Sequence, residues 1–151
     1  MTARTLIISL GIVVGFAVCL SAGASGADPV NRGADGVAIR GYDVVAYFTD
    51  SKAVKGSGKF EHAWKGAKWR FVSAAHRDAF AAAPDKYAPQ FGGYCAWTMA
   101  HRSVLEGDPE VWNIVNGKLY FNNNKTAQAK WSEDRPRWIV DASLYWPGLS
   151  R

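Results

Sequence analysis

The chain has 151 residues, a formal net charge of +5 at pH 7 and a hydrophobic content of 48%. This length suffices for one hydrophobic core once the apolar N-terminal segment is set aside. The basic residues are scattered among acids, without a basic run interleaved with aromatics, so the composition argues against a nucleic-acid-binding protein. No repeat of solenoid type is evident.

The N-terminal segment predicts export. Arg4 precedes an apolar run from Leu6 to Leu20, and small residues follow up to Ala27. This is the layout of a secretory signal peptide, and the run of about 15 residues is shorter than the roughly 20 that a membrane span needs. We predict a signal peptide over residues 1–27, cleaved between Ala24 and Ala27, and a periplasmic or secreted protein. Membrane association follows only if the segment stays uncleaved.

Export makes the cysteine count informative. Cys19 lies in the signal segment, which leaves Cys95 as the single cysteine of the mature chain. It has no internal disulfide partner, and an unpaired thiol in an oxidising compartment is unusual. Three explanations stay open: a buried and inert side chain, a metal ligand, or a reactive thiol.

The first half of the mature chain predicts a hairpin followed by a helix. Phe60–Trp64 alternates as a strand does, and Lys68–Val72 returns after a turn at Gly66. Ser73 is a suitable N-cap for a helix over residues 74–83. Three segments precede this unit, a flexible Gly-rich leader, a short strand and a short apolar helix, over residues 28–36, 37–39 and 44–48.

The second half predicts another hairpin. Asn116-Gly117 separates Val111–Val115 from Lys118–Phe121, and an Asn-Gly pair between two such runs is the strongest short hairpin signal. Two helices follow, over residues 126–131 and 136–144. The predicted fold class is therefore α+β, a small single domain with two antiparallel hairpins and several short helices.

The stretch Gln90–His101 joins the two halves and carries the lone thiol. A loop held by Pro84 and Pro89 leads into Gly92-Gly93, which indicates a sharp turn. A helix from Tyr94 to Arg102 places Cys95 and Met99 on one face. It also puts the thiol near a helix N-terminus, whose partial positive charge favours the thiolate.

With these elements in place, the chain resembles the YHS domain family. The match in the first half consists of spaced aromatic, glycine, histidine and proline positions: Phe60, Trp64, Gly66, Trp69, Phe71, Ser73, His76, Phe80, Pro84 and Tyr87. Four further motifs are similar to an exported branch of the family: Gly41-Tyr42-Asp43, Gly92-Gly93-Tyr94-Cys95-Ala96, Asp108-Pro109-x-x-Trp112 and Gly117-Lys118-Leu119-Tyr120-Phe121-Asn122. The resemblance implies a YHS-like domain over residues 37–149.

This resemblance implies binding of copper or another heavy metal. The copper-transporter members carry two cysteines at positions that look like Val72 and His76 here, so one ligand is lost and the other becomes an imidazole. Relatives with selenocysteine at the position like Cys95 imply redox chemistry instead.

Cys95 and His76 are the main candidates for a site, with His62 and Met99 as further metal ligands. Thiolate, imidazole and thioether form a small, soft set that favours copper(I), whereas structural zinc normally takes four protein ligands. Packing explains His62 and Met99 equally well, and solvent exposure explains His101. Every functional role requires that Cys95 and His76 lie together.

We therefore predict an exported binding module for a transition metal of copper type, rather than an enzyme. One alternative is a thiol-redox protein in which Cys95 is catalytic and relies on an external resolving thiol. The other is an interaction scaffold with an inert cysteine. The expected partners are a metal ion and a metal-handling or redox protein, without a nucleotide, an organic cofactor or nucleic acid.

Overall fold

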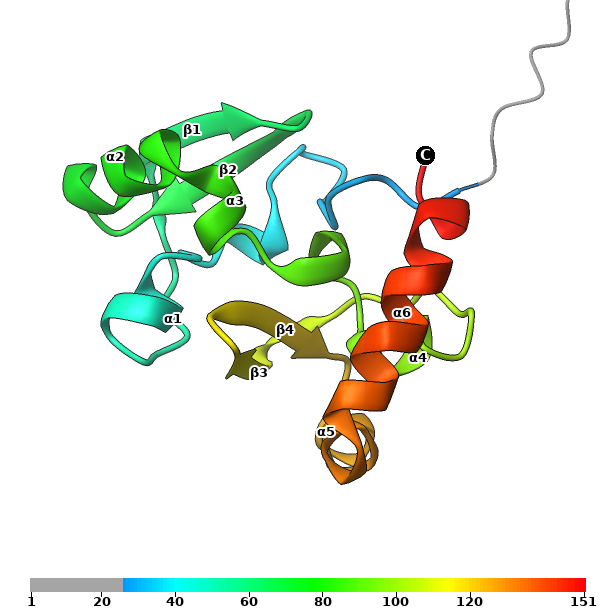
Figure 1. Ribbon diagram of the computed structural model, residues 1–151. Coiled ribbons are helices and arrows are strands. Elements are labelled where there is room, and N and C mark those ends of the chain that lie inside the picture. The colour runs from blue at the N-terminus through cyan, green and yellow to red at the C-terminus, as the bar shows by residue number, and fades with distance from the viewer. Residues whose placement is uncertain (1–25) are drawn as a thin grey trace, which may run out of the picture.

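Two antiparallel hairpins organise residues 26–151, which are the residues that the computed structural model describes (Figure 1). Strand β1 (Ser57–Trp64) pairs with β2 (Ala67–Phe71), and β3 (Asp108–Val115) pairs with β4 (Lys118–Asn122). Eight short helical elements surround them: η1 Ile39–Gly41, α1 Ala46–Thr49, α2 Ala74–Ala82, α3 Pro84–Tyr87, η2 Gln90–Gly93, α4 Ala96–Met99, α5 Lys125–Glu133 and α6 Arg135–Leu149. The predicted α+β class is confirmed. Apart from Gly26 and Ala27, the predicted signal peptide lies outside the described residues.

Both predicted hairpins are confirmed, and their turn residues explain them. Lys65 and Gly66 have φ of 47° and 71°, and Asn116 and Gly117 have φ of 50° and 73°. Two successive residues with positive φ make the turn whose twist matches that of the flanking strands. Asparagine and glycine adopt this conformation at low cost, so the second turn is encoded more strongly than the first.

The residues after Ala83 differ from the prediction. Residues 84–87, expected as a loop, form the single-turn helix α3 with Pro84 in its first turn. Proline suits that position because its missing N–H has no partner there in any helix. The last helix, α6, extends well beyond residues 136–144 at its C-terminal end, with Pro147 in its last turn.

Within residues 28–36, expected as a flexible leader, the middle part packs against the core while residues 32–35 are exposed. Val30 and Asn31 are buried. The backbone N–H of Asn31 donates to Gly92 O at 2.8 Å, and its carbonyl accepts from Ile39 N at 2.9 Å. The leader is therefore tied to both η1 and η2. Val37 adds only an isolated bridge to Lys68, in place of the predicted strand over residues 37–39.

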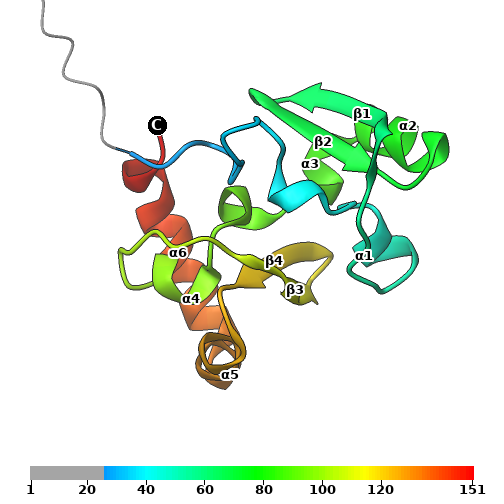
Figure 2. The same ribbon diagram turned by 180° about the vertical axis from the view of Figure 1, so that it is seen from behind.

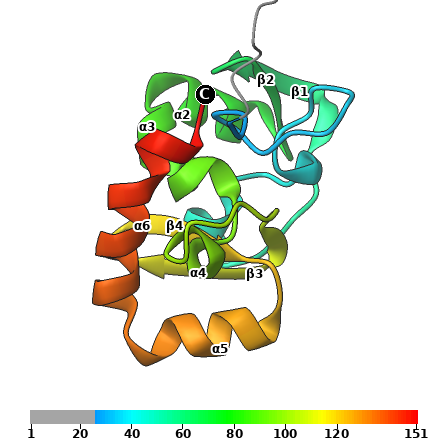
Figure 3. The same cartoon turned by 90° about the vertical axis from the view of Figure 1, so that its right-hand side faces the viewer.

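The hairpins define two halves (Figures 2 and 3), and the buried side chains form two hydrophobic clusters, the first of which also takes in Leu119 and Phe121 of β4. Hairpin β1–β2 with α2 and α3 buries Trp69, Phe71 and Phe80. Hairpin β3–β4 with α4, α5 and α6 buries Met99 and Trp131. Among residues 26–151, no helix combines the length and hydropathy needed to cross a bilayer.

Tyr47 of α1 joins the two halves. Its ring meets Trp112 and Phe121 edge-on, with centroids 5.1 and 5.5 Å apart, and its hydroxyl donates to Pro109 O at 2.9 Å. Burial raises the pKa of Tyr47, so its hydroxyl stays protonated and donates to Pro109 O in the other half.

The two halves also repeat one another, which the sequence reading did not detect. In the first hairpin Ser57 pairs with Phe71, and in the second Asp108 pairs with Asn122, 51 positions later in both cases. Both ladders then carry a register irregularity at the same place before regular pairing resumes. Shared irregularities are a stronger sign of repetition than hairpins alone, because bulges have specific positions in a strand pair.

The segments before the hairpins repeat as well. Each half begins with three successive residues of positive φ, a rare backbone conformation: 50°, 52° and 79° for Ile39–Gly41, and 53°, 61° and 85° for Phe91–Gly93. A tyrosine follows each run, and then Asp43 in the first half and Cys95 in the second. Asp43 and Cys95 therefore occupy equivalent places.

The helices after the hairpins begin in the same way. Ser73, the predicted N-cap of α2, accepts from His76 N at 3.2 Å, which confirms the prediction. Asn124 caps α5 by accepting from Ala127 N at 2.8 Å. His76 and Ala127 are thus equivalent positions, one with an imidazole and one with a methyl group.

Candidate functional site

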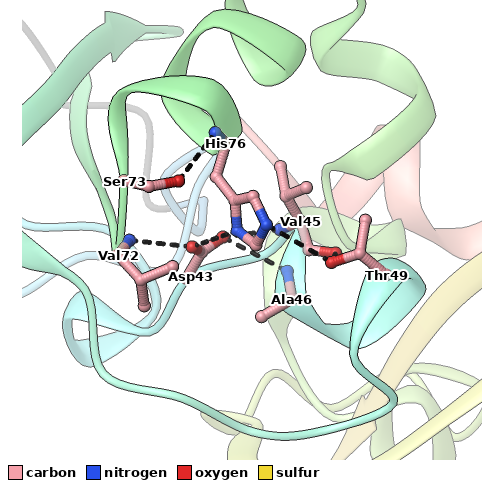
Figure 4. Close-up of polar contacts among 7 residues, drawn as sticks. All are labelled: Asp43, Val45, Ala46, Thr49, Val72, Ser73 and His76. Atoms are coloured by element: carbon pink, nitrogen blue, oxygen red, sulfur yellow. Dashed lines mark hydrogen bonds and ion pairs between the residues drawn. The ribbon is translucent and has the colours of Figure 1, made fainter.

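A buried carboxylate, Asp43, is the centre of the polar site in the first half (Figure 4). Its side chain is fully buried and uses both oxygens. Oδ1 accepts from Val45 N at 2.9 Å and from Ala46 N at 3.3 Å. Oδ2 accepts from Val72 N at 2.9 Å and from His76 Nδ1 at 2.7 Å. A buried charge needs this degree of compensation, because its transfer out of water is costly.

The position of Asp43 follows from local backbone needs. The first amides of α1 lack partners within the helix, and an aspartate just before a helix supplies an acceptor for them. Val72, which directly follows β2, would likewise have an unused N–H. One carboxylate therefore connects the start of α1, the end of β2 and the first turn of α2.

The bond to Asp43 determines the state of the His76 ring. A carboxylate only accepts hydrogen bonds, so Nδ1 carries the hydrogen and Nε2 keeps its lone pair in the neutral ring. The His76 side chain is 18% exposed. Nε2 lies 3.5 Å from Thr49 Oγ1, a long contact, and that hydroxyl is also 3.2 Å from Val45 O, to which it donates. The Nε2 lone pair of His76 therefore lies near the surface, while Nδ1 is bonded to the buried carboxylate of Asp43.

Cys95 lies in the second half, in a different environment. Its side chain is fully buried, and Sγ lies 3.7 Å from Asn122 Oδ1 and 3.6 Å from Asn123 Oδ1. Trp97 N also donates to Asn122 Oδ1, at 3.1 Å, which sets the orientation of that amide. The S–H group therefore donates towards two amide oxygens.

The helix expected from Tyr94 to Arg102 is much shorter. It is the single turn α4, Ala96–Met99, with Cys95 as its N-cap residue. The backbone N–H of Cys95 donates to Leu105 O at 2.9 Å, so it is not available as a donor to the sulfur atom. A helix of one turn has a small dipole, so the predicted activation of the thiol loses its main support.

We expect Cys95 to resist labelling by a maleimide in the native protein and to react fully in 6 M guanidinium chloride. The reason is its complete burial between β4 and α4. The labelling rate, followed by mass spectrometry, measures the accessibility of the thiolate. Labelling of the native protein as fast as that of a free thiol would contradict the buried thiol described here.

The other two candidate ligands, His62 and Met99, are packed in separate places, and His101 is exposed as expected. His62 meets Phe80 edge-on, with ring centroids 5.9 Å apart. Met99 is fully buried in the cluster of the second half, together with Trp131. His101 is exposed, and its ring packs on Trp97 with centroids 4.2 Å apart.

The structure therefore gives Cys95 and His76 different partners. His76 contacts Asp43 and Thr49, whereas Cys95 contacts two asparagines of the other half. Within residues 26–151, no group of three or more His, Cys, Asp and Glu side chains is placed to hold a metal ion. The four candidate ligands each have separate neighbours, since His62 packs on Phe80 and Met99 lies in the cluster with Trp131. The site contains one imidazole, that of His76, whose orientation is set by the carboxylate of Asp43.

The sequence reading missed three residues of these sites, Asp43, Asn122 and Asn123. Asp43 carried a signal, since it follows a Gly-Tyr pair and precedes an apolar helix as a capping residue does. The asparagines at the end of β4 resemble an ordinary turn composition, and only the contact with Cys95 marks them.

Comparisons with protein-family models, with curated proteins and with solved structures find no match for this chain. The geometry of the Asp43–His76 pair and of the Cys95 environment is therefore the basis for inferring a function.

Proposed function

We propose that the protein is an exported binding module of YHS type in which His76 Nε2 is a ligand for a transition metal ion of copper type. The observation that supports this is the 2.7 Å bond between His76 Nδ1 and the fully buried carboxylate of Asp43. Histidines that ligate metals almost always donate their other ring hydrogen to a carboxylate, a carbonyl or water, which orients the ring and raises its basicity.

The site would be an open one. His76 contributes one protein ligand, and the remaining positions of the ion would be filled by solvent or by side chains of a metal-handling partner. Such a site releases its ion readily, which suits transfer better than storage. Cys95 is not part of it, since its sulfur contacts amide oxygens in the other half. Export through a signal peptide over residues 1–27 is part of the proposal, and it places metal binding outside the cytoplasm.

The test is anaerobic copper(I) titration of the exported protein, followed by NMR of the histidine side chains and by calorimetry. We expect the His76 ring signals to shift and His76→Ala to abolish binding. Asp43→Asn should weaken binding about 10- to 100-fold, as loss of an outer-shell carboxylate does. Cys95→Ser and His101→Ala are the matched controls, one for the thiol and one for an exposed histidine, and both should bind as the natural protein does.

Two outcomes would contradict this proposal. One is binding that survives His76→Ala, and the other is binding that disappears in Cys95→Ser while the fold is retained. The second result would restore the thiol as a ligand and would require the Cys95 environment to rearrange.

The interaction scaffold is the second candidate, and one feature favours it. Val140 and Leu144, four residues apart on α6, are 66% and 71% exposed. Residues at this spacing share a helix face, so they form a small apolar strip. If copper(I) leaves every histidine signal unchanged, the metal proposal fails, and this apolar strip favours the interaction scaffold. The thiol-redox alternative has less support, since Cys95 is buried and its S–H group is directed towards an amide oxygen.

A further inference from the structure

The second half contains a hollow beside Ala127, the residue equivalent to His76. The hollow has a volume of about 210 Å³ and lies between α4 and the first turns of α5. Its walls include Trp97 and Thr98 of α4, Asn123 from the end of β4, and Ala127 and Lys130 of α5. Ala127 is the residue equivalent to His76, because each is the third residue after the cap of its helix.

The repeat relates the surroundings of the hollow to those of His76. In the first half, Asp43 Oδ2 accepts from both His76 Nδ1 and the backbone N–H of Val72, the residue after β2. In the second half Cys95 stands in the place of Asp43, and Asn123 stands in the place of Val72. The backbone geometry of the site is thus repeated, whereas the ring that fills it has been replaced by a methyl group.

Asn122, which precedes the lining residue Asn123, is incompletely paired. Asn122 is fully buried, and its Oδ1 accepts from Trp97 N and from Cys95 Sγ. Its Nδ2 has no hydrogen-bond partner among the described residues. A buried amide nitrogen without a partner costs free energy, and in native proteins such a group usually has a specific reason. By contrast, both oxygens of the Asp43 carboxylate accept hydrogen bonds.

The lining indicates what kind of ligand fits. Asn123 Oδ1 is an acceptor for a ring N–H, and the Trp97 indole offers an aromatic wall. The Thr98 hydroxyl already donates to Cys95 O at 3.2 Å, so the donor to a ring nitrogen is the ammonium group of Lys130. The ammonium group of Lys130 disfavours a cationic ring. A small, neutral, planar ring with one N–H donor and one nitrogen acceptor meets all of these conditions.

We propose that this hollow binds an imidazole ring, supplied either by a histidine of a partner protein or by a free small molecule, in the place that His76 occupies in the first half. The proposal is independent of metal binding at His76. The experiment uses the exported protein labelled with ¹⁵N and free imidazole as the probe. A ring of five heavy atoms supports affinity in the millimolar range. We expect saturable shifts of the Trp97 indole and Asn123 amide signals, with the Trp112 signal unchanged.

Two substitutions test the location through the internal repeat. Ala127→His supplies the missing ring and should abolish the shifts at Trp97 and Asn123. His76→Ala creates the matching hollow in the first half and should add a second set of saturable shifts, around Thr49 and Val72. Should Ala127→His fail to fold, Thr98→Ile narrows the hollow from a partly exposed position and should likewise abolish binding.

Further probes distinguish the source of the ring. A peptide with one histidine that binds at least tenfold more tightly than free histidine indicates a protein partner, and equal affinities indicate a small molecule. The proposal is overturned if imidazole produces no saturable shift, or if the shifts persist in a folded Ala127→His variant. It is also overturned if inorganic phosphate shifts the same signals and imidazole does not, since the hollow would then be an anion site formed by Lys130.

Discussion

Asp43→Ala is expected to lower the free energy of unfolding by about 3–5 kcal/mol, which is the range for breaking a buried charged network. The substitution removes the acceptor of three backbone N–H groups, those of Val45, Ala46 and Val72, and of His76 Nδ1. Each buried donor that loses its partner costs about 1–3 kcal/mol. Urea denaturation at pH 7 measures the loss.

The matched control for this change is Asp78→Ala. Asp78 lies in the middle of α2, its side chain is 66% exposed, and among the described residues it bonds the neighbouring Arg77. An exposed ion pair of this kind contributes about 0–1 kcal/mol. If the two variants lose the same small amount of stability, Asp43 does not hold the network described here. Asp43→Asn should fall between them, because it keeps the volume and one acceptor oxygen.

Gly107→Ala is expected to cost about 3 kcal/mol, at the upper end of the usual cost of overpacking. A Cβ at this position would lie far inside van der Waals contact with Gly93 O and 2.6 Å from Phe121 Cβ. The backbone has to move, since one of the two obstacles is a carbonyl that accepts from Gly107 N at 3.2 Å. Because Cys95 pairs with Phe121 at the same place, we also expect faster maleimide labelling of Cys95 in this variant.

The repeat supplies a second case and α6 supplies a control. Gly56, the equivalent of Gly107, would place a Cβ against the backbone of Arg70 and Phe71, so Gly56→Ala should cost a similar amount. Gly148 in α6 faces open space and has a φ that any residue adopts. Gly148→Ala should be neutral or stabilise by up to about 1 kcal/mol through helix propensity. Equal thermal stability of all three variants would contradict this packing.

The candidate site was only partly predictable from the sequence. His76 was identified as a chemically important residue, but its partner was sought in Cys95 and is in fact Asp43, 33 positions earlier. Both pairings were compatible with the residue types. The choice between them depends on which loop reaches the first turn of α2, and that contact is formed by chain segments far apart in sequence.

The internal repeat was equally hard to recognise, for a physical reason. The two halves keep the backbone features, namely the left-handed runs, the hairpin register and the helix caps, while most side chains differ. A backbone conformation tolerates many side chains, so conservation of geometry leaves only a weak trace in the residues. The glycine, tyrosine and turn positions carry that trace.

The sequence by itself determined the elements that depend on neighbouring residues. The hairpin turns at Gly66 and Gly117 and the capped start of α2 at Ser73 follow from local backbone preferences, and all were predicted correctly. The tertiary structure alone decided which polar groups meet. It placed His76 on a buried carboxylate and Cys95 on two amides, because long-range packing and the satisfaction of buried hydrogen bonds select these contacts, and neither has a local signature.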